Sequence, residues 1–149
     1  MLTIYRDLLD AIRAQARRDA PLESCGVIAG PAGSDQPARL IPIRNAAAAP
    51  DFFRFDAQEH LRAWRDMGAR GEVPVVIYHS HTQSVAYPSR DDAALASEPD
   101  AHYVIVSTQP GAAPDVRSFR IAGETVVEEA IRVIERETQP ISTADTAAI

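Results

Sequence analysis

Two histidines just beyond an apolar run could bind one metal ion. The run, Pro74-Val75-Val76-Ile77, is typical of a short buried strand, and His79 and His81 come soon after it. If the strand continues through His81, both imidazoles lie on one face, because side chains alternate between the two faces of a strand. The spacing therefore predicts a pair of nitrogen ligands at a strand end.

A third ligand of suitable type follows on a predicted helix. Pro88 stiffens the intervening turn, and Ser89 is placed to cap a helix from about Arg90 to Ala96. Asp92 then lies in the first turn of that helix. Zinc accepts histidine and aspartate ligands, and three protein ligands leave a fourth position for water, which is the arrangement of a catalytic zinc site.

Each half of this pattern has a simpler explanation when it is taken alone. Ser89-x-x-Asp92 is close to a capping box, in which the residue three positions on supports the start of a helix. A His-x-His pair on a strand can equally be structural or face solvent. The two halves in this order and at this spacing favour the metal site, and Ser89 could both cap the helix and orient the Asp92 carboxylate.

The pattern resembles the signature of the JAMM metalloproteases, also called the MPN+ family. That signature is His-x-His, seven residues and then Ser-x-x-Asp, with a glutamate upstream. Here it corresponds to His79, His81, Ser89 and Asp92, and the upstream partner is Glu23 in a Glu-x-Cys-Gly strand. The resemblance covers roughly residues 1 to 130 and extends to Asn45 and to Phe55-x-x-x-x-Glu59.

The resemblance implies a role for each residue of the signature. One zinc ion per chain would be held by His79, His81 and Asp92, and it would lower the pKa of a bound water towards about 7. Glu23 would act as base and then as acid, although local sequence alone places it at a solvated strand entry. Ser89 would stabilise the oxyanion of the tetrahedral intermediate.

One departure from the family narrows the function. Most members have proline after the second histidine, whereas this chain has Thr82. With Tyr87-Pro88-Ser89-Arg90, this version is most similar to the bacterial subgroup that releases cysteine from a ubiquitin-like sulfur-carrier protein. The resemblance implies a peptidase that cuts after the carrier's C-terminal Gly-Gly. The alternatives are a deubiquitinase-like isopeptidase, a small-peptide hydrolase and a scaffold without metal.

Composition bounds the class of protein and its surroundings. With 149 residues the chain is long enough for one domain, which we expect over residues 1–137, with a flexible tail at 138–149. A net charge of -6 disfavours a nucleic-acid partner, and we see neither a signal peptide nor a membrane span. The single cysteine predicts a reducing, cytoplasmic setting, and a homodimer stays open.

Two further residues are weaker candidates for chemistry. Cys25 lies in an apolar strand, where a buried thiol is inert rather than nucleophilic. His102 begins another strand, away from the face pattern of the first two histidines. Deaminase chemistry also uses zinc, but its His-x-Glu and Pro-Cys-x-x-Cys motifs do not occur here.

Helical and alternating patterns predict the elements that must position these residues. Helices are expected at 3–18 and 57–70, and strands at 24–29, 39–44, 74–81, 102–107, 116–121 and 125–128. Residues 130–137 could form a short helix or continue the last strand, and Phe52, Phe53 and Phe55 are expected at a core-facing strand edge. This order indicates an α/β or α+β domain with a mixed sheet between helices. The resemblance implies a three-layer α/β/α domain with a mixed sheet, like JAB/MPN proteins and related to cytidine deaminases.

Overall fold

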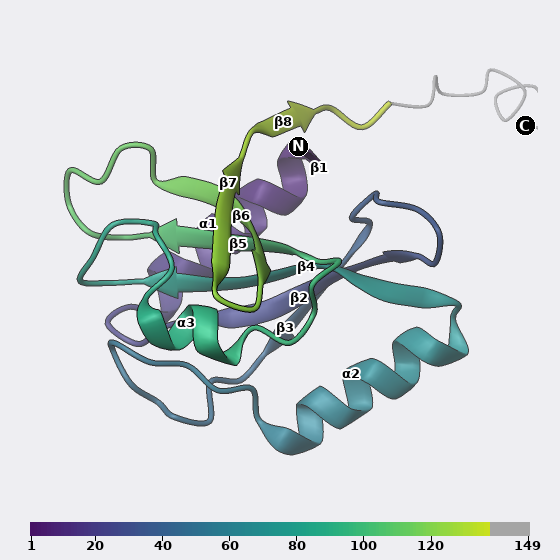
Figure 1. Ribbon diagram of the computed structural model, residues 1–149, viewed down its shortest axis with the longest axis horizontal. Helices are drawn as coiled ribbons and strands as arrows, with labels where there is room; N and C mark the ends of the chain where they lie inside the picture. The colour runs from purple at the N-terminus through teal and green to yellow at the C-terminus, as the bar shows by residue number, and fades with distance from the viewer. Residues whose placement is uncertain (138–149) are drawn as a thin grey trace, which may run out of the picture.

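The computed structural model describes residues 1–137, in which helices and strands surround a six-stranded sheet (Figure 1). The elements in chain order are β1 (Leu2–Tyr5), α1 (Arg6–Asp19), β2 (Cys25–Pro31), β3 (Arg39–Ile43), α2 (Ala57–Ala69), β4 (Glu72–His81), α3 (Arg90–Leu95), β5 (His102–Ser107), β6 (Val116–Ala122), β7 (Thr125–Glu129) and β8 (Ile131–Ile134).

The central sheet is mixed, as predicted. Its strands lie in the order β3-β2-β4-β5-β6-β7, and β4 and β5 run parallel while the other neighbours are antiparallel. The strand β4 therefore lies inside the sheet, with β2 on one side and β5 on the other. Hydrogen bonding along both edges fixes the register of the strand that carries both histidines.

Helices cover both faces of this sheet, which confirms the expected three-layer α/β/α architecture. One core cluster joins Leu8, Leu9 and Ile12 of α1 to side chains such as Val76 and Val104. A second cluster, on the other face, joins Ala63 and Met67 of α2 to side chains that include Ile77, Ile105 and Phe119. The apolar residues of α1 recur at helical spacing, so one side of the helix can be buried against the sheet.

Alternation along β4 decides which face of the sheet carries the candidate site. Val76 and Tyr78 belong to the cluster under α1, whereas Ile77 belongs to the cluster under α2. By the same alternation His79 and His81 lie on the α2 face. Ala93 of α3 also packs against the α2-side cluster, so α3 approaches the histidines from the same face.

Both ends of the described chain differ from the sequence prediction. Residues 3–5 do not begin the helix; they belong to β1, in which Leu2 and Ile4 are fully buried. Residues 130–137 neither form a helix nor extend β7, because β8 pairs in parallel with β1, with Leu2 opposite Ile131. This small second sheet depends on pairing between the two ends, which local patterns do not reveal. The predicted tail at 138–149 lies outside the described residues.

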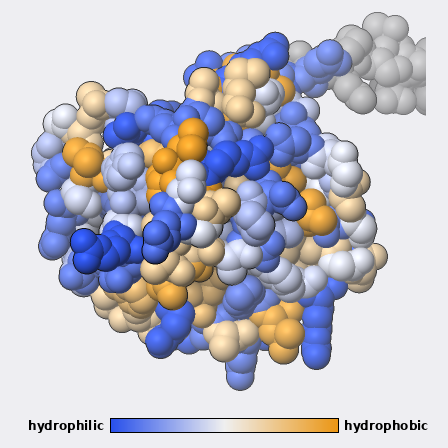
Figure 2. All heavy atoms as spheres, viewed as in Figure 1, coloured by the Kyte–Doolittle hydropathy of each residue, from blue (hydrophilic) through white to orange (hydrophobic). Residues whose placement is uncertain are grey.

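The surface mixes hydrophilic and hydrophobic side chains. Figure 2 shows one face, on which hydrophilic residues surround smaller hydrophobic patches. Within residues 1–137 none of the helices combines the length and the apolar character that a membrane crossing requires. The apolar side chains gather mainly in the two clusters on either side of the sheet.

Candidate metal centre

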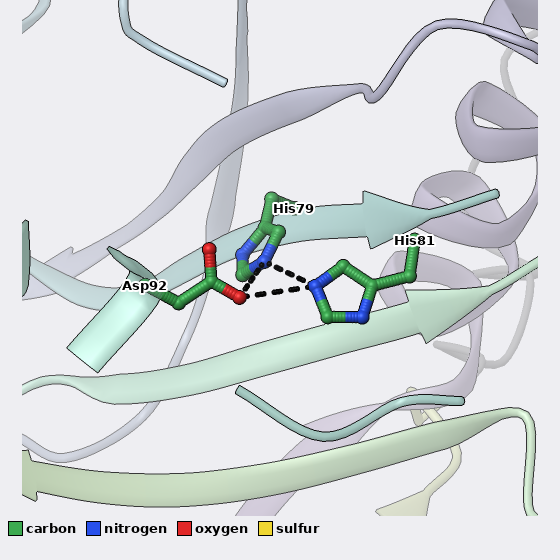
Figure 3. A group of neighbouring side chains, drawn as sticks. All are labelled: His79, His81 and Asp92. Carbon is green, nitrogen blue, oxygen red and sulfur yellow. Dashed lines mark hydrogen bonds and ion pairs between the residues drawn. The ribbon is translucent and has the colours of Figure 1, made fainter. Parts of the chain in front are cut away.

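Three side chains predicted to bind metal meet at one point (Figure 3). The Nε2 atoms of His79 and His81 are 3.1 Å apart, and each lies 3.0 Å from Oδ2 of Asp92. The histidines come from the end of β4, and the aspartate comes from the first turn of α3. Within residues 1–137 this is the one group of at least three histidine, cysteine or carboxylate ligand atoms close enough to share an ion.

Capping of α3 holds Asp92 in this arrangement. Ser89 precedes the helix, its Oγ accepts a hydrogen bond from the Asp92 amide at 3.0 Å, and Asp92 Oδ2 accepts one from the Ser89 amide at 2.8 Å. This is the reciprocal capping box that the sequence offered as an alternative explanation. The two interpretations are compatible, because the oxygen that closes the box is the one that faces the histidines.

The hydrogen bonds of His81 determine where its lone pair lies. Nδ1 lies 2.8 Å from the carbonyl oxygen of Val85, which can only accept, so Nδ1 carries the hydrogen and donates. A neutral ring then presents the lone pair of Nε2 to the carboxylate of Asp92. Two electron-rich atoms at 3.0 Å repel each other unless a proton or a metal cation lies between them.

The pKa values of the three side chains follow from the same crowding. Burial lowers the pKa of His79 by more than its bond to Asp92 raises it. Burial also acts to lower the pKa of His81, but the contacts with Asp92 and Val85 outweigh it and the pKa is raised. Burial acts to raise the pKa of Asp92, yet its bonds to both histidines hold the pKa well below its usual range. A proton on His81 Nε2 and a metal cation would therefore compete for the same position beside Asp92.

The donor set also fits zinc in size. Tetrahedral zinc with bonds of about 2.0–2.1 Å separates neighbouring donors by about 3.3 Å. The three observed separations are 3.0, 3.0 and 3.1 Å, so a small outward movement of each donor accommodates the ion. Two imidazoles and a carboxylate supply three bonds, which leaves one coordination position for water or substrate.

Glu23 lies buried beside this group, at the entry to β2. Glu23 is 5% exposed, and among the described residues its Oε1 has no hydrogen-bond partner. Burial raises the pKa of the Glu23 carboxyl to about 7; the nearby His81 acts in the opposite direction, while Asp92 and Asp51 add to the increase. The solvated position that local sequence favoured is wrong, because the side chain is buried and lies in the electrostatic field of His81 and Asp92.

Residues next to the two histidines tie Glu23 to β4. Ser80 lies between them, so alternation turns it to the opposite face, where its Oγ accepts a hydrogen bond from the Ser24 amide at 2.7 Å. Thr82, which replaces the usual proline, lies with its hydroxyl 3.1 Å from the carbonyl of Pro21 and 2.9 Å from that of Pro50. The departure from the family pattern thus adds a polar link to the loops that flank Glu23.

A cavity of about 430 Å³ opens beside the predicted metal ligands. Its walls include His79 and Asp92 together with many apolar and aromatic side chains, among them Phe52, Phe53, Phe55, Trp64 and Tyr103. The three phenylalanines were expected at a core-facing strand edge. Phe55 agrees with this in part, because it forms an isolated bridge with Asn45 and packs against the α2-side cluster, whereas Phe52 and Phe53 lie in irregular chain. Phe53 instead stacks on His79, with ring centroids 4.4 Å apart and planes 22° apart.

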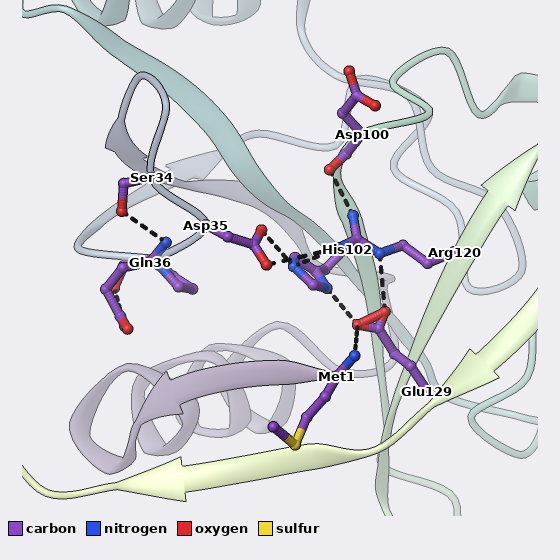
Figure 4. Close-up of polar contacts among 9 residues, drawn as sticks. Met1, Ser34, Asp35, Gln36, Asp100, His102, Arg120 and Glu129 are labelled. Atoms are coloured by element: carbon purple, nitrogen blue, oxygen red, sulfur yellow. Dashed lines mark hydrogen bonds and ion pairs between the residues drawn. The ribbon is translucent and has the colours of Figure 1, made fainter.

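The two weaker candidates, His102 and Cys25, are both buried and lie outside the predicted metal site. His102 is fully buried, and its Nδ1 and Nε2 contact Glu129 and Asp35, within the polar cluster of Figure 4 and not among the metal ligands. Cys25 is also buried, and its thiol donates to the carbonyl of Ile43. Burial raises the pKa of this thiol to about 12, which agrees with the prediction that it is inert.

Known proteins resemble this chain over most of its length. A family model described as prokaryotic homologs of the JAB domain matches residues 6–122. The CysO-cysteine peptidase of Mycobacterium tuberculosis is 54% identical over 136 residues, which are 91% of this chain and 93% of that protein. The desampylase of Haloferax volcanii is 33% identical over 111 residues, 71% of this chain and 80% of the desampylase.

Solved structures share the fold as well. The protein DSY2949 from Desulfitobacterium hafniense is 34% identical with a TM-score of 0.78, and the match covers 91% of this chain and 94% of the DSY2949 chain. AF2198, a JAB1/MPN domain protein from Archaeoglobus fulgidus, is 23% identical with a TM-score of 0.60, covering 89% and 99%. The family resemblance and the expected fold are confirmed: this chain belongs to the prokaryotic JAB-domain family, as a hydrolase of the peptidase class.

Proposed function

We propose that this protein is a cytoplasmic zinc peptidase that hydrolyses the amide bond after the C-terminal Gly-Gly of a ubiquitin-like sulfur-carrier protein and releases cysteine. The observation that carries the proposal is the convergence of the His79, His81 and Asp92 ligand atoms within 3.1 Å of one another. The assignment of the substrate rests on the 54% identity to a CysO-cysteine peptidase. A homodimer is a further expectation, which sedimentation analysis would test.

One zinc ion per chain is held by His79, His81 and Asp92 in this proposal. When bound there, zinc supplies a Lewis acid for the scissile carbonyl and lowers the pKa of a water molecule. His81 is already oriented for this role, because Val85 accepts the hydrogen of its Nδ1 and leaves Nε2 free as a ligand.

Glu23 moves the proton. A carboxyl group with a pKa of about 7 exchanges a proton readily near neutral pH, which suits a group that must act first as base and then as acid. Its buried Oε1, unpartnered among residues 1–137, is available to accept the proton of the attacking water. The same carboxyl then donates that proton to the departing amine of cysteine, so the amide bond breaks without releasing a charged amide anion.

Ser89 stabilises the developing oxyanion. Its Oγ accepts a hydrogen bond from the Asp92 amide. This bond uses a lone pair of the oxygen, so the hydroxyl hydrogen can still donate. The capping box fixes the Ser89 side chain next to a metal ligand, so the donor is positioned before the reaction begins. One residue thus caps the helix and carries out a catalytic role.

The cavity receives the extended tail of the carrier protein. Its largely apolar wall keeps bulk water away from the reacting amide, which strengthens the charge interactions around it. Glycines at the cleavage site allow the chain to approach the metal closely, since they carry no Cβ. The remainder of the tail lies along the aromatic side chains of the cavity.

Cleavage of a carrier protein that ends in Gly-Gly-Cys tests the substrate assignment. Mass spectrometry should show loss of one cysteine, and a chelator should stop the reaction until zinc is restored. Carrier ending in Gly-Gly-Ala separates recognition of cysteine from recognition of the tail. Zinc-loaded protein that leaves the Gly-Gly-Cys carrier intact would contradict the assignment.

An isopeptidase is the second candidate, because a desampylase is 33% identical over 71% of this chain. The same assay distinguishes the two if a carrier joined through an isopeptide bond to lysine is offered alongside the Gly-Gly-Cys carrier. Faster cleavage of the isopeptide would support the second candidate. The scaffold alternative is disfavoured, because the three ligands and Glu23 all lie together.

A further inference from the structure

Asn45 uses every hydrogen-bonding position of its side chain to join two segments at the candidate site. Its Nδ2 donates to the carbonyl of Glu23 at 3.1 Å and to that of Phe52 at 2.9 Å. Its Oδ1 accepts from the amides of Ala47 and Arg54, both at 3.0 Å. A side-chain amide offers two hydrogens and two lone pairs, so all four are engaged and all four partners are backbone atoms.

The first segment carries the proposed base. The Glu23 carboxyl has an unpartnered Oε1 among the described residues, so its position depends on the backbone from which it extends. That backbone is held on both sides: Asn45 binds the carbonyl, and the amide of Glu23 donates to Ala49 at 3.0 Å. Ala49 belongs to the loop that Asn45 also fastens through Ala47.

The second segment carries the ring that packs on a metal ligand. Asn45 binds the carbonyl of Phe52 and the amide of Arg54, which are the two neighbours of Phe53. Phe53 stacks on His79 at 4.4 Å between ring centroids. The backbone of Arg54 is held again by Ala46, whose amide donates to the Arg54 carbonyl at 2.8 Å.

We propose that Asn45 is a positioning residue for the reaction, holding the backbone of Glu23 and the Phe53 segment at a fixed separation. It acts through other residues, since its four bonds go to backbone atoms. The inference rests on the proposed function in one respect, namely that Glu23 is the base. It goes beyond that function because it assigns a residue outside the metal signature to the reaction geometry.

Replacement of Asn45 by aspartate tests this directly. The side chains have nearly the same shape, but Asn45→Asp places an oxygen where Nδ2 faced two carbonyl oxygens, so both donated bonds are lost and repulsion replaces them. Gln15→Glu is a matched control on α1. Gln15 is also buried, and its Nε2 donates at 3.1 Å to the carbonyl of Cys25, two residues after Glu23.

The account predicts that Asn45→Asp lowers kcat about 10- to 100-fold, since a misplacement of about 1 Å can cost that much. KM should change by less than about threefold, and bound zinc should be unchanged, because the metal ligands keep their own contacts. Gln15→Glu should lower the melting temperature without this loss of kcat. In a Glu23→Gln background, Asn45→Asp should reduce the residual rate no further, because the base it positions is already absent.

The inference is overturned if Asn45→Asp leaves kcat unchanged, if Gln15→Glu lowers kcat equally, or if the effects of Asn45→Asp and Glu23→Gln multiply. Amide hydrogen exchange provides a measurement that needs no substrate. In Asn45→Ala, exchange should accelerate at least about tenfold at Ala47 and Arg54, whose amides lose the Oδ1 acceptor of Asn45. Exchange should also accelerate at Glu23, because its amide donates to Ala49 in the loop that Asn45 no longer holds. Wild-type protein without turnover would contradict the proposed function, whereas unchanged exchange at Glu23 would contradict the role of Asn45.

Discussion

Glu23 gains its proposed reactivity from an unfavourable position. A carboxyl group that is nearly buried, with an oxygen unpartnered among the described residues, is less stable as an anion than it is in water. Burial therefore raises its pKa to about 7, despite the nearby His81. The sequence alone did not predict this environment, because it is produced by contacts with β4 and with the loop before α2.

Replacing this carboxyl by its neutral isostere should stop the reaction and leave the metal bound. We expect Glu23→Gln to lower kcat by about 10²–10⁴, since general acid–base catalysis contributes roughly that factor. The amide keeps the size of the side chain but cannot accept the proton of the attacking water. Metal analysis alongside the rate separates the two effects, and full activity in this variant would remove Glu23 from the mechanism.

The same carboxyl should make metal-free protein less stable as pH rises. Its pKa is about 7 when folded and about 4.3 when unfolded, so between these values the folded state holds a proton that the unfolded state has lost. The free energy of unfolding therefore falls from about pH 4 to pH 7, by at most about 4 kcal/mol, and levels off above. Urea unfolding in chelator should show Glu23→Gln gaining stability over wild type across this range; a constant difference would contradict the pKa assignment.

At the scale of elements, the site is the meeting of a strand end with a helix start. Alternation placed His79 and His81 on one face, and the cap at Ser89 placed Asp92 in the first turn, both as predicted. These features could be read from sequence because each depends on residues only a few positions apart. The stacking of Phe53 on His79 could not, because an irregular segment before α2 brings the ring there.

Loss of the helix cap should weaken metal binding as well as the helix. Ser89→Ala removes the oxygen that accepts the Asp92 amide, which should cost about 1 kcal/mol of stability. Because Asp92 is then less well oriented, the zinc dissociation constant should rise about 10-fold or more. Competition with a coloured chelator measures this constant. Ser89→Thr keeps a hydroxyl and should bind zinc almost as wild type does, so equal losses in both variants would contradict the capping role.

The helix α2 contributes a wall of the cavity, and its two faces should respond differently to mutation. Trp64 lines the cavity, whereas Leu61 on the same helix is 53% exposed and is not part of the lining. Trp64→Ala should raise KM for the carrier about 10-fold with kcat nearly unchanged, because it removes binding surface remote from the reacting bond. Leu61→Ala should leave both constants close to wild type. If Trp64→Ala lowered kcat without changing KM, this would contradict binding of the substrate tail along this wall.

At the scale of the molecule, the sequence predicted the layers and missed what joins the two ends. Local periodicity identifies each amphipathic helix and each alternating strand. The order of these elements along the chain then indicates helices on both faces of a mixed sheet. The β1–β8 sheet pairs residues near the N-terminus with residues 131–134, and no local pattern encodes such distant contacts. The cavity is likewise formed by segments far apart in the chain, from Phe52 to Ile121.

The central claim is that the His79, His81 and Asp92 group holds the zinc on which peptide hydrolysis depends. The most direct measurement is a titration of chelator-treated protein with zinc, in which bound metal and cysteine release are followed together. The account predicts that activity rises in proportion to bound zinc and saturates at one ion per chain, and that His81→Ala abolishes both. Full activity in metal-free protein, or stoichiometric zinc retained by the His81→Ala variant, would contradict it.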